Sequence, residues 1–541
     1  MPARLGSAKH AAAEEGGVRK AASRTVLAAA LIAVVPLCAA AAPSTMTTSP
    51  VVVRLLERYR AAVQDPGSPE LTRYIVSGTL AGEGLTGTFR SVRDGERSRD
   101  DQQLGPRAEI VIGNGEQVYV RDSEGAVRQL TGVLLRRSRT ERFIDDGTFA
   151  EHPERCVDRG SARLGERTVR VLDVTAPDGQ TETLYLDDRT SLPARVAYDE
   201  DDGRTTIDLD DWRTVAGHRF AFHAVISNGD HAFDVTQVTT AVQVVATVPA
   251  GTFDVKPARK IDMPVPQTLP ISERQNHLYV PVHINGETFD FLLDTGAASL
   301  LIDRHVANTL GLQQQGSFEA SGANRTGGIS VARLPDIEVG NGHLHDLVVS
   351  VVDLGGSTRG AFRIDGILGY PFFAQAMVRL DLAHHTMTFG PPGSLPVSGA
   401  RIPLELDRSL PEATLRLNNL VDGQFVIDTG DSAEMLIYRP FLDRHPGVVP
   451  FTTMDRSSYG LGGATTSYRS TLDELNIGGV PLYHVSADVM LATSGAFADR
   501  FTSGNIGLGV LRNFVVTFDE ANGAMYVEKS SQFDDGRDRY R

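Results

Sequence analysis

Asp-Thr-Gly occurs twice in this chain, each time directly after a run of apolar residues. The first copy, FLLDTGAAS, covers residues 291–299, and the second, FVIDTGDSA, covers residues 425–433. A carboxylate that follows three apolar residues is costly to bury unless it has a partner or a chemical task. Asp294 and Asp428 therefore constrain the fold more than any other residues, because each needs such a partner.

The two triplets belong to a longer internal repeat. Each copy contains, in the same order, the triplet, an apolar cluster, a glycine pair and a glycine-containing apolar element. These landmarks are Asp-Thr-Gly at 294–296 and 428–430, SLLI at 299–302 and EMLI at 434–437, Gly327-Gly328 and Gly462-Gly463, and DGILGYPFF at 365–373 and NIGLGVLRNF at 505–514. Since each copy offers a single aspartate, a two-carboxylate site requires the copies to face each other across a pseudo-twofold axis.

This order of motifs resembles the aspartic proteases of the retroviral and pepsin-like types, especially their bacterial relatives. The resemblance covers both copies, about half of the chain. It implies two fused lobes with Asp294 and Asp428 as a catalytic dyad, an exported endopeptidase that hydrolyses peptide bonds, and a monomeric functional unit. In such a dyad the two carboxyls share one proton, so one acts as a base toward water and the other as an acid.

The resemblance also implies roles for residues around the dyad. The residues expected to support the dyad are Thr295, Gly296, Thr429, Gly430, Ile367, Leu368, Gly369 and Gly509. The residues expected in flaps over the cleft are Gly327, Gly328, Tyr459, Gly460, Gly462 and Gly463. The threonines should hydrogen-bond across the lobes, and the glycines that follow them should donate amides to the carboxylates. Glycine at a flap tip permits a tight hairpin that opens for a peptide and closes over it.

Two departures from the family pattern concern the second copy. Asp431 occupies the position of Ala297, and an additional carboxylate near the dyad would raise pKa values by like-charge repulsion if it points inward. Exposure to solvent or pairing with an arginine are the alternatives. Gly507 aligns with Ile367, which predicts a thinner apolar backing behind the second loop.

The region in front of the repeat follows a different pattern. Val52, Leu55, Leu56 and Tyr59 recur at helical spacing, and short runs with period-two alternation follow from Thr72 onward, separated by turn signals. This pattern predicts one helix and a long antiparallel meander. The stretch TLYLDDRTSLPARVAYDEDDGRTTIDLDDWRTVAGHRFAFHAVIS resembles the bacterial outer-membrane lipoprotein-carrier fold, a half-closed β-barrel around an apolar cavity.

The predicted fold is therefore mostly β: a bilobal, aspartic-protease-like double β-barrel, preceded by an antiparallel half-barrel domain with one N-terminal helix. The expected segments are a signal peptide at 1–42, the carrier-like domain at 50–255, a linker at 256–270, the first lobe at 271–396, the second lobe at 397–529 and a flexible tail at 530–541.

The first residues have the pattern of an export signal. Arg19, Lys20 and Arg24 precede the apolar stretch TVLAAALIAVVPLCAAAA, which ends in small residues. We therefore expect a periplasmic or extracellular protein, associated with a membrane if the signal is retained or if Cys38 is lipidated. Removal of the signal leaves Cys156 alone, so no intrachain disulfide is expected.

The remaining composition limits the possible partners. The net charge of −15, without a basic block, argues against nucleic acid. No HExxH, strand-to-helix GxGxxG or GxSxG frame is found, and neither a cofactor nor a metal is expected. The expected partners are a peptide or protein substrate and a lipid or lipoprotein at the N-terminal domain. The alternative function is a non-catalytic pseudo-protease that binds a peptide or a lipid without cutting it.

Overall fold

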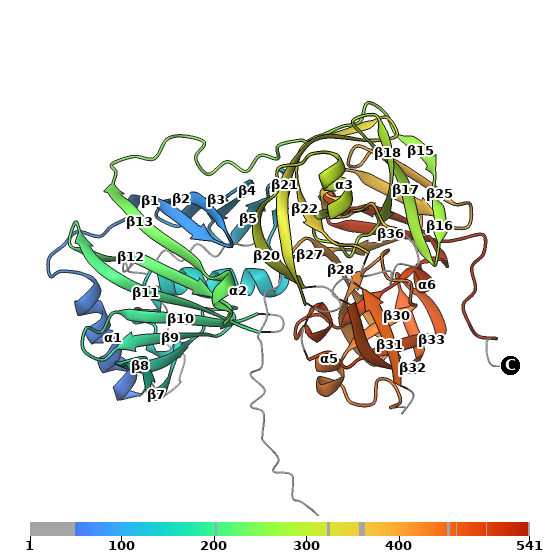
Figure 1. The fold of residues 1–541 in the computed structure, drawn as a ribbon. Coiled ribbons are helices and arrows are strands. Elements are labelled where there is room, and N and C mark those ends of the chain that lie inside the picture. Colours follow the sequence, from blue (N-terminus) through green and yellow to red (C-terminus); the bar gives the residue numbers. More distant parts are fainter. Residues whose placement is uncertain are drawn as a thin grey trace, which may run out of the picture.

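The N-terminal region forms one antiparallel sheet, and the Asp-Thr-Gly repeats form two lobes beside it (Figure 1). The computed structural model describes residues 49–200, 203–321, 325–355, 363–451, 455–460, 463–493 and 495–538. The predicted signal peptide lies outside the described residues. Within the described ranges, no helix has both the length and the apolar character needed to cross a membrane.

The N-terminal sheet has thirteen strands in the order β6-β5-β4-β3-β2-β1-β13-β12-β11-β10-β9-β8-β7. Its strands are β1 (Arg73–Gly82), β2 (Leu85–Asp94), β3 (Arg97–Leu104), β4 (Arg107–Asn114), β5 (Gln117–Arg121), β6 (Val127–Gln129), β7 (Cys156–Leu164), β8 (Arg167–Val174), β9 (Glu182–Asp187), β10 (Pro193–Asp199), β11 (Arg204–Val215), β12 (His218–Ser227) and β13 (Val235–Val244). The predicted antiparallel meander is confirmed, and the first strand pairs with the last at the middle of the sheet.

Two helices accompany this sheet. The predicted helix is α1 (Pro50–Val63), and its residues Val52, Leu55, Leu56 and Tyr59 are all buried, as their spacing predicts. The second helix, α2 (Gly132–Asp145), was not evident from the sequence, because its apolar residues do not recur at a clear helical period. It connects the two edge strands β6 and β7. A pocket beneath α2 is lined by charged side chains of this helix and by apolar residues that include Val118, Val120 and Leu134.

The two lobes have the same order of elements, apart from the additional strand β14 at the start of the first lobe. The first contains β14 (Ile261–Asp262), β15 (Gln267–Pro270), β16 (Ser272–Arg274), β17 (His277–Ile284), β18 (Glu287–Leu293), β19 (Leu300–Asp303), α3 (Arg304–Thr309), β20 (Gln315–Ser321), β21 (Arg325–Val339), β22 (Gly342–Val352), β23 (Gly366–Leu368), α4 (Tyr370–Phe373), β24 (Met377–Asp381) and β25 (Thr386–Gly390). The second contains β26 (Ala400–Pro403), β27 (Glu405–Asp407), β28 (Leu410–Leu417), β29 (Val421–Ile427), β30 (Met435–Tyr438), α5 (Arg439–Arg444), β31 (Asp455–Gly460), β32 (Gly463–Ile477), β33 (Val480–Met490), β34 (Gly504–Ile506), α6 (Leu508–Leu511), β35 (Phe514–Asp519) and β36 (Ala524–Lys529).

Each lobe closes into a barrel. In the first lobe the strands pair in the ring β17-β18-β23-β19-β22-β21, which closes where β21 pairs with β17. The second lobe repeats this ring with β28-β29-β34-β30-β33-β32, closed by β32 and β28. The predicted bilobal double barrel behind an antiparallel sheet is therefore confirmed.

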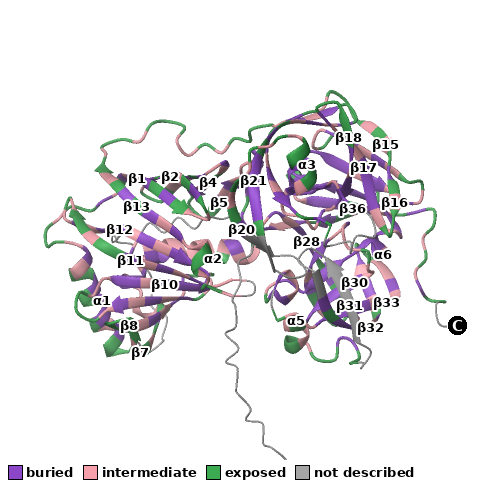
Figure 2. Cartoon of the chain, viewed as in Figure 1, coloured by how far each residue is buried: buried purple, intermediate pink, exposed green. Residues whose placement is uncertain are grey.

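A third sheet joins the lobes to each other. Its order is β15-β25-β24-β35-β36-β26, so the closing hairpin of the first lobe pairs directly with that of the second. The apolar core is continuous across this sheet. The rings of Phe373 and Phe518 pack edge to face, with 5.6 Å between the ring centres. Buried positions run along β17, β21 and β36, whereas α3 has an exposed outer face and buries only Val306 and Ala307 (Figure 2).

The segments expected as a linker and as a flexible tail both contact the lobes. The linker segment 256–270 contains β14 and β15, which pair with β22 and β25 of the first lobe. In the tail, the main chain of Asp535 accepts a hydrogen bond from Tyr483, and the ring of Phe533 lies 6.0 Å from that of Phe514. Described residues of both segments thus contact the lobes, and the boundaries assigned to the linker and the tail stay predictions.

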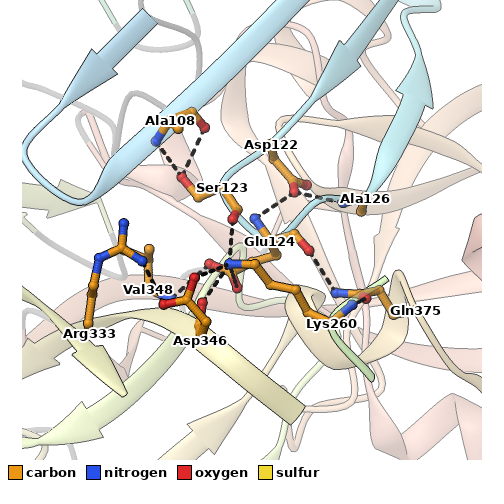
Figure 3. Close-up of polar contacts among 10 residues, drawn as sticks. All are labelled: Ala108, Asp122, Ser123, Glu124, Ala126, Lys260, Arg333, Asp346, Val348 and Gln375. Carbon is orange, nitrogen blue, oxygen red and sulfur yellow. Dashed lines mark hydrogen bonds and ion pairs between the residues drawn. The ribbon is translucent and has the colours of Figure 1, made fainter. Parts of the chain in front are cut away.

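The turn between β5 and β6 fastens the N-terminal domain to the first lobe (Figure 3). Glu124 accepts a hydrogen bond from the amide of Val348, and its main-chain oxygen accepts one from the side chain of Gln375, each at 3.0 Å. The Lys260 ammonium donates to the main-chain oxygens of Ser123 at 2.8 Å and Asp346 at 2.5 Å, and lies 3.7 Å from the Glu124 carboxylate. Lys260 thus bonds to both sides of the interface.

We predict that Lys260→Met lowers the free energy of unfolding by about 2–4 kcal/mol, because the buried Glu124 carboxylate loses its cation. Urea unfolding followed by tryptophan fluorescence measures this change. Lys256→Met is the matched control, since the Lys256 side chain is 78% exposed and pairs only at the surface with Asp254; it should change the free energy by less than about 0.5 kcal/mol. Equal losses in the two variants would contradict the role given to Lys260.

Candidate active site

The two Asp-Thr-Gly loops meet where the lobes face each other. Each loop follows the strand that carries its apolar run, β18 in the first lobe and β29 in the second. The amide of Asp294 donates to the Leu368 oxygen at 3.1 Å, and the amide of Asp428 donates to the Ile506 oxygen at 2.9 Å. The short strands β23 and β34 therefore lie directly behind the two loops and fix the direction in which each aspartate leaves its barrel.

Thr295 and Thr429 exchange hydrogen bonds across the lobes. The Thr295 hydroxyl donates to the Ile427 oxygen at 2.6 Å and accepts the Thr429 amide at 3.0 Å. Reciprocally, the Thr429 hydroxyl donates to the Leu293 oxygen and accepts the Thr295 amide, both at 3.0 Å. Both threonines are at most 1% exposed, so these bonds are shielded from water.

The glycines after the threonines interlock the loops. Gly296 donates its amide to Asp294 Oδ1 at 2.8 Å, and Gly430 donates to Asp428 Oδ1 at 2.9 Å. A β-carbon on Gly296 would lie 2.4 Å from the carboxyl carbon of Asp428, and one on Gly430 would lie 2.3 Å from that of Asp294. Each glycine is therefore required because the aspartate of the other lobe packs against it.

The two carboxyl groups are hydrogen-bonded to each other at the floor of the interface. Burial raises the pKa of Asp294 well above its usual range, and the negative charge of Asp428 raises it further. Burial also raises the pKa of Asp428, but there the hydrogen bonds from Asp294 and from two loop amides oppose the shift. The Asp428 carboxyl accepts hydrogen bonds from the Gly430 and Asp431 amides and from Asn505, whereas the Asp294 carboxyl accepts one from the Gly296 amide, so the negative charge is favoured on Asp428 and the proton on Asp294.

Asn505 is a polar neighbour of the dyad that the sequence motifs did not reveal. Its side-chain amide donates to Asp428 Oδ2 at 2.6 Å, and its side-chain oxygen accepts the Tyr438 hydroxyl at 2.5 Å. Both Asn505 and Tyr438 are buried. The strand registers place Asn505 opposite Val426, as Ile367 lies opposite Leu292, so the first lobe has an apolar side chain at the equivalent position.

This register corrects the alignment made from the sequence. Gly507, and not Gly509, corresponds to Gly369, because Ile506 and Leu368 are the residues that bind the aspartate amides. A β-carbon on Gly369 or Gly507 would collide with main-chain oxygens of the adjacent loop. The common Leu-Gly pair was misleading because Leu508 and Gly509 belong to helix α6, where the Gly509 amide bonds to Ala433.

Asp431 points inward, toward the dyad. The sequence left three alternatives for its side chain: this orientation, exposure to solvent and pairing with an arginine. Its amide donates to Asp428 Oδ1 at 3.1 Å, and its own Oδ1 accepts the Ala433 amide at 2.9 Å. Among the described residues, Asp431 Oδ2 is buried and has no hydrogen-bond partner. Burial, with the nearby charge of Asp428 as the next cause, raises the pKa of Asp431 to about 7. Ala297 has the equivalent place, since it also follows its aspartate by three residues.

The expected flap residues belong to two hairpins. Gly327 and Gly328 lie in β21, near its first residue Arg325, where this strand pairs with β20. Tyr459, Gly460 and Gly463 lie at the end of the β31–β32 hairpin, where Gly460 pairs with Gly463. Gly462 lies outside the described residues. The described flap residues therefore belong to two equivalent hairpins, and their position over the dyad stays a prediction.

One group of side chains has the spacing of a metal site in the part of the chain that the structure describes. Asp336, Glu338 and His343 lie on β21 and β22, near the turn that joins these strands. All three side chains are partly or fully exposed and lie on one face of the hairpin. In the sequence they are distant from both Asp-Thr-Gly loops. Nothing in their surroundings indicates a cofactor for the dyad.

We predict that Asn505→Leu raises the pKa of Asp428, because the ionised carboxylate loses a buried donor. Titration of the aspartate carboxyl carbons by ¹³C NMR measures this pKa directly and requires no activity. Asn341→Leu is the control, since Asn341 is exposed in the β21–β22 turn. An unchanged or lowered pKa of Asp428 in the Asn505 variant would show that this hydrogen bond does not stabilise the charge.

Comparisons with solved structures return chains that match about two fifths of this protein at 10–11% identity. A DUF1329 family protein from Desulfovibrio piger matches with 11% identity, 38% coverage of this chain, 96% coverage of its own and a TM-score of 0.27. A putative outer membrane lipoprotein-sorting protein domain from Vibrio parahaemolyticus has 10% identity, and the match covers 37% of this chain and 95% of its own with a TM-score of 0.26. A LolA superfamily protein from Nitrosomonas europaea has 11% identity, and the match covers 39% of this chain and 98% of its own with a TM-score of 0.27. TM-scores this low carry no argument about function.

Family models give a clearer result for the first lobe. No curated protein matches the chain. Residues 280–372 match the model of the aspartyl protease family. The matched segment includes the first Asp-Thr-Gly and the strand behind it, from β17 to α4. The resemblance to aspartic proteases is therefore confirmed, and it is the first lobe that carries the family's sequence pattern.

Proposed function

We propose that this chain is an exported aspartic endopeptidase that hydrolyses peptide bonds with a water molecule held between Asp294 and Asp428. The observation that carries the proposal is the contact between the two carboxyls, one from each lobe, which hydrogen-bond to each other and are locked by buried threonines. The family match of the first lobe supports the same reaction class. The N-terminal apolar stretch supports export.

The hydrogen bonds around the dyad favour a division of roles. In the proposed reaction, the oxygen of the water molecule forms a bond to the carbonyl carbon of the substrate. At the same time, ionised Asp428 accepts a proton from this water. Asp294 gives its proton to the carbonyl oxygen, so a tetrahedral diol forms without separated charge. When the carbon–nitrogen bond breaks, the amine takes the proton from Asp428 and one diol hydroxyl returns a proton to Asp294. The dyad then regains its starting state.

The second candidate is a pseudo-protease that binds a peptide without cutting it. The buried Asp431 carboxyl favours this candidate, because a second negative charge beside Asp428 would oppose ionisation of the base. The pocket beneath α2 has both charged and apolar walls, and these do not identify a ligand of the N-terminal domain. Peptide is therefore the ligand that we propose in either case.

We predict that Asp294→Asn and Asp428→Asn each reduce kcat for an unfolded protein substrate by more than about a thousandfold, because one carboxyl cannot act as both acid and base. Cleavage is followed by electrophoresis and mass spectrometry from acidic to neutral pH. Asp473→Asn is the control, since Asp473 is exposed on β32. Full activity in either dyad variant would refute the enzyme, and saturable binding without cleavage by the unmodified chain would favour the pseudo-protease.

We also predict a pH effect of Asp431→Ala, which copies Ala297 of the first lobe. The negative charge of Asp431 contributes to the raised pKa of Asp294. Removing this charge lowers the pKa of Asp294, so the dyad loses its proton at lower pH and the alkaline limb of kcat/KM moves to lower pH. The pH profile of peptide cleavage measures the shift. A shift of the alkaline limb to higher pH would contradict the assignment of the proton to Asp294.

A further inference from the structure

A pocket lies where the N-terminal domain meets the first lobe, next to the first Asp-Thr-Gly loop. Its lobe side includes Ala298, Ser299 and Phe318, and its N-terminal side includes Glu109 and Glu124. The space measures about 770 Å³ together with its open mouth. The fold creates this pocket only because the β5–β6 turn is fastened to the first lobe (Figure 3).

The pocket is continuous with the loop that carries Asp294. Ala298 and Ser299 follow this aspartate by four and five residues, in the same loop. The Ala297 oxygen accepts the amide of Tyr370, and the Tyr370 side chain both lines the pocket and hydrogen-bonds to Asp122 of the N-terminal domain. The pocket therefore lies beside the loop that carries Asp294, and its far wall belongs to another domain.

The ionisable side chains that line the pocket are predominantly carboxyl groups. They comprise three carboxylates, Glu109, Asp122 and Glu124, and one guanidinium, that of Arg107. Arg107 already forms an ion pair with Glu83 and stacks over the ring of Phe318, 5.0 Å from the ring centre. Lys260 partly balances Glu124 from outside the pocket, and the chain as a whole has a net charge of −15.

Glu109 is the carboxylate without a hydrogen-bond partner. It is 5% exposed, and within the described part of the chain neither of its oxygens accepts a hydrogen bond. Arg128 and Arg137 are the cations that act on it, neither through a hydrogen bond, and burial dominates so that the pKa of Glu109 rises to about 8. A buried carboxyl in this condition is costly unless a ligand supplies the missing donor.

We propose that this pocket binds a lysine or arginine side chain of the peptide that occupies the cleft, with Glu109 as the group that receives the cation. The inference rests on the proposed function, because it assumes that peptide is the ligand of the dyad. Phe318, Val331 and Val348 provide apolar walls for the methylene chain, and Glu109 provides a carboxyl that ionises when the cation of the ligand lies beside it. An acidic side chain would meet three carboxylates, and an apolar one would leave Glu109 unpaired. The N-terminal domain thus helps to select the substrate.

The test uses the full chain and a set of octapeptides in which each position in turn carries lysine, acetyl-lysine, norleucine or glutamate. Cleavage by the unmodified chain gives kcat/KM, and fluorescence anisotropy with the Asp294→Asn chain gives affinity without cleavage. At one position, lysine should exceed norleucine and acetyl-lysine by about tenfold or more, and glutamate should bind weakest. Glu109→Gln should bring the lysine-to-norleucine ratio close to one, because it keeps the shape and removes the charge.

Glu166→Gln is the matched control, since Glu166 is exposed in the β7–β8 turn; it should leave the ratio unchanged. Thermal melting confirms that the Glu109 variant is folded, and the comparison of lysine with acetyl-lysine on the unmodified chain requires no variant at this position. No preference for a cation at any position, or an undiminished preference in the Glu109 variant, would overturn the pocket assignment. Preferred binding of lysine peptides without any cleavage would instead refute the proposed enzyme and retain the pocket.

Discussion

The arrangement of the site depends on the hydrogen bonds that Thr295 and Thr429 exchange between the lobes. Each threonine donates to the strand that carries the other aspartate and accepts the amide of the other threonine. Because both side chains are buried, a displacement of one lobe would leave several polar groups without partners, at a cost of about 1–3 kcal/mol each. Two carboxyls that would repel each other when both ionised are thus held together by neutral bonds.

Around the symmetrical hydrogen bonds of the two threonines, the lobes differ in the polar groups that surround Asp294 and Asp428. Identical loops would give Asp294 and Asp428 identical environments, and the choice of acid and base would then be left to the substrate. Asn505 and the Asp431 amide break this symmetry by donating only to Asp428. The first lobe has Ile367 at the position of Asn505, so a difference of one side chain between equivalent strands separates the electrostatic states of the two carboxyls.

The sequence predicts those features that depend on short periods and repeated motifs. Alternating residues indicated the antiparallel meander, helical spacing indicated α1, and the repeated triplets indicated two barrels with facing aspartates. The sequence did not reveal Asn505, because its contact with Asp428 depends on a strand register that the common Leu-Gly pair disguised. Nor did it reveal α2, whose burial is set by tertiary packing, or the inward direction of Asp431, which a turn conformation decides.

The sheet shared by the two lobes also affects the order of events during synthesis. Strand β24 pairs with β35, and Asp381 reaches its partner Val515 only after nearly all of the second lobe has been made. At about 5–20 residues per second, the ribosome needs on the order of ten seconds to supply that partner. During this interval the nascent first lobe presents an open strand edge, where pairing with another chain competes with pairing to its own second half.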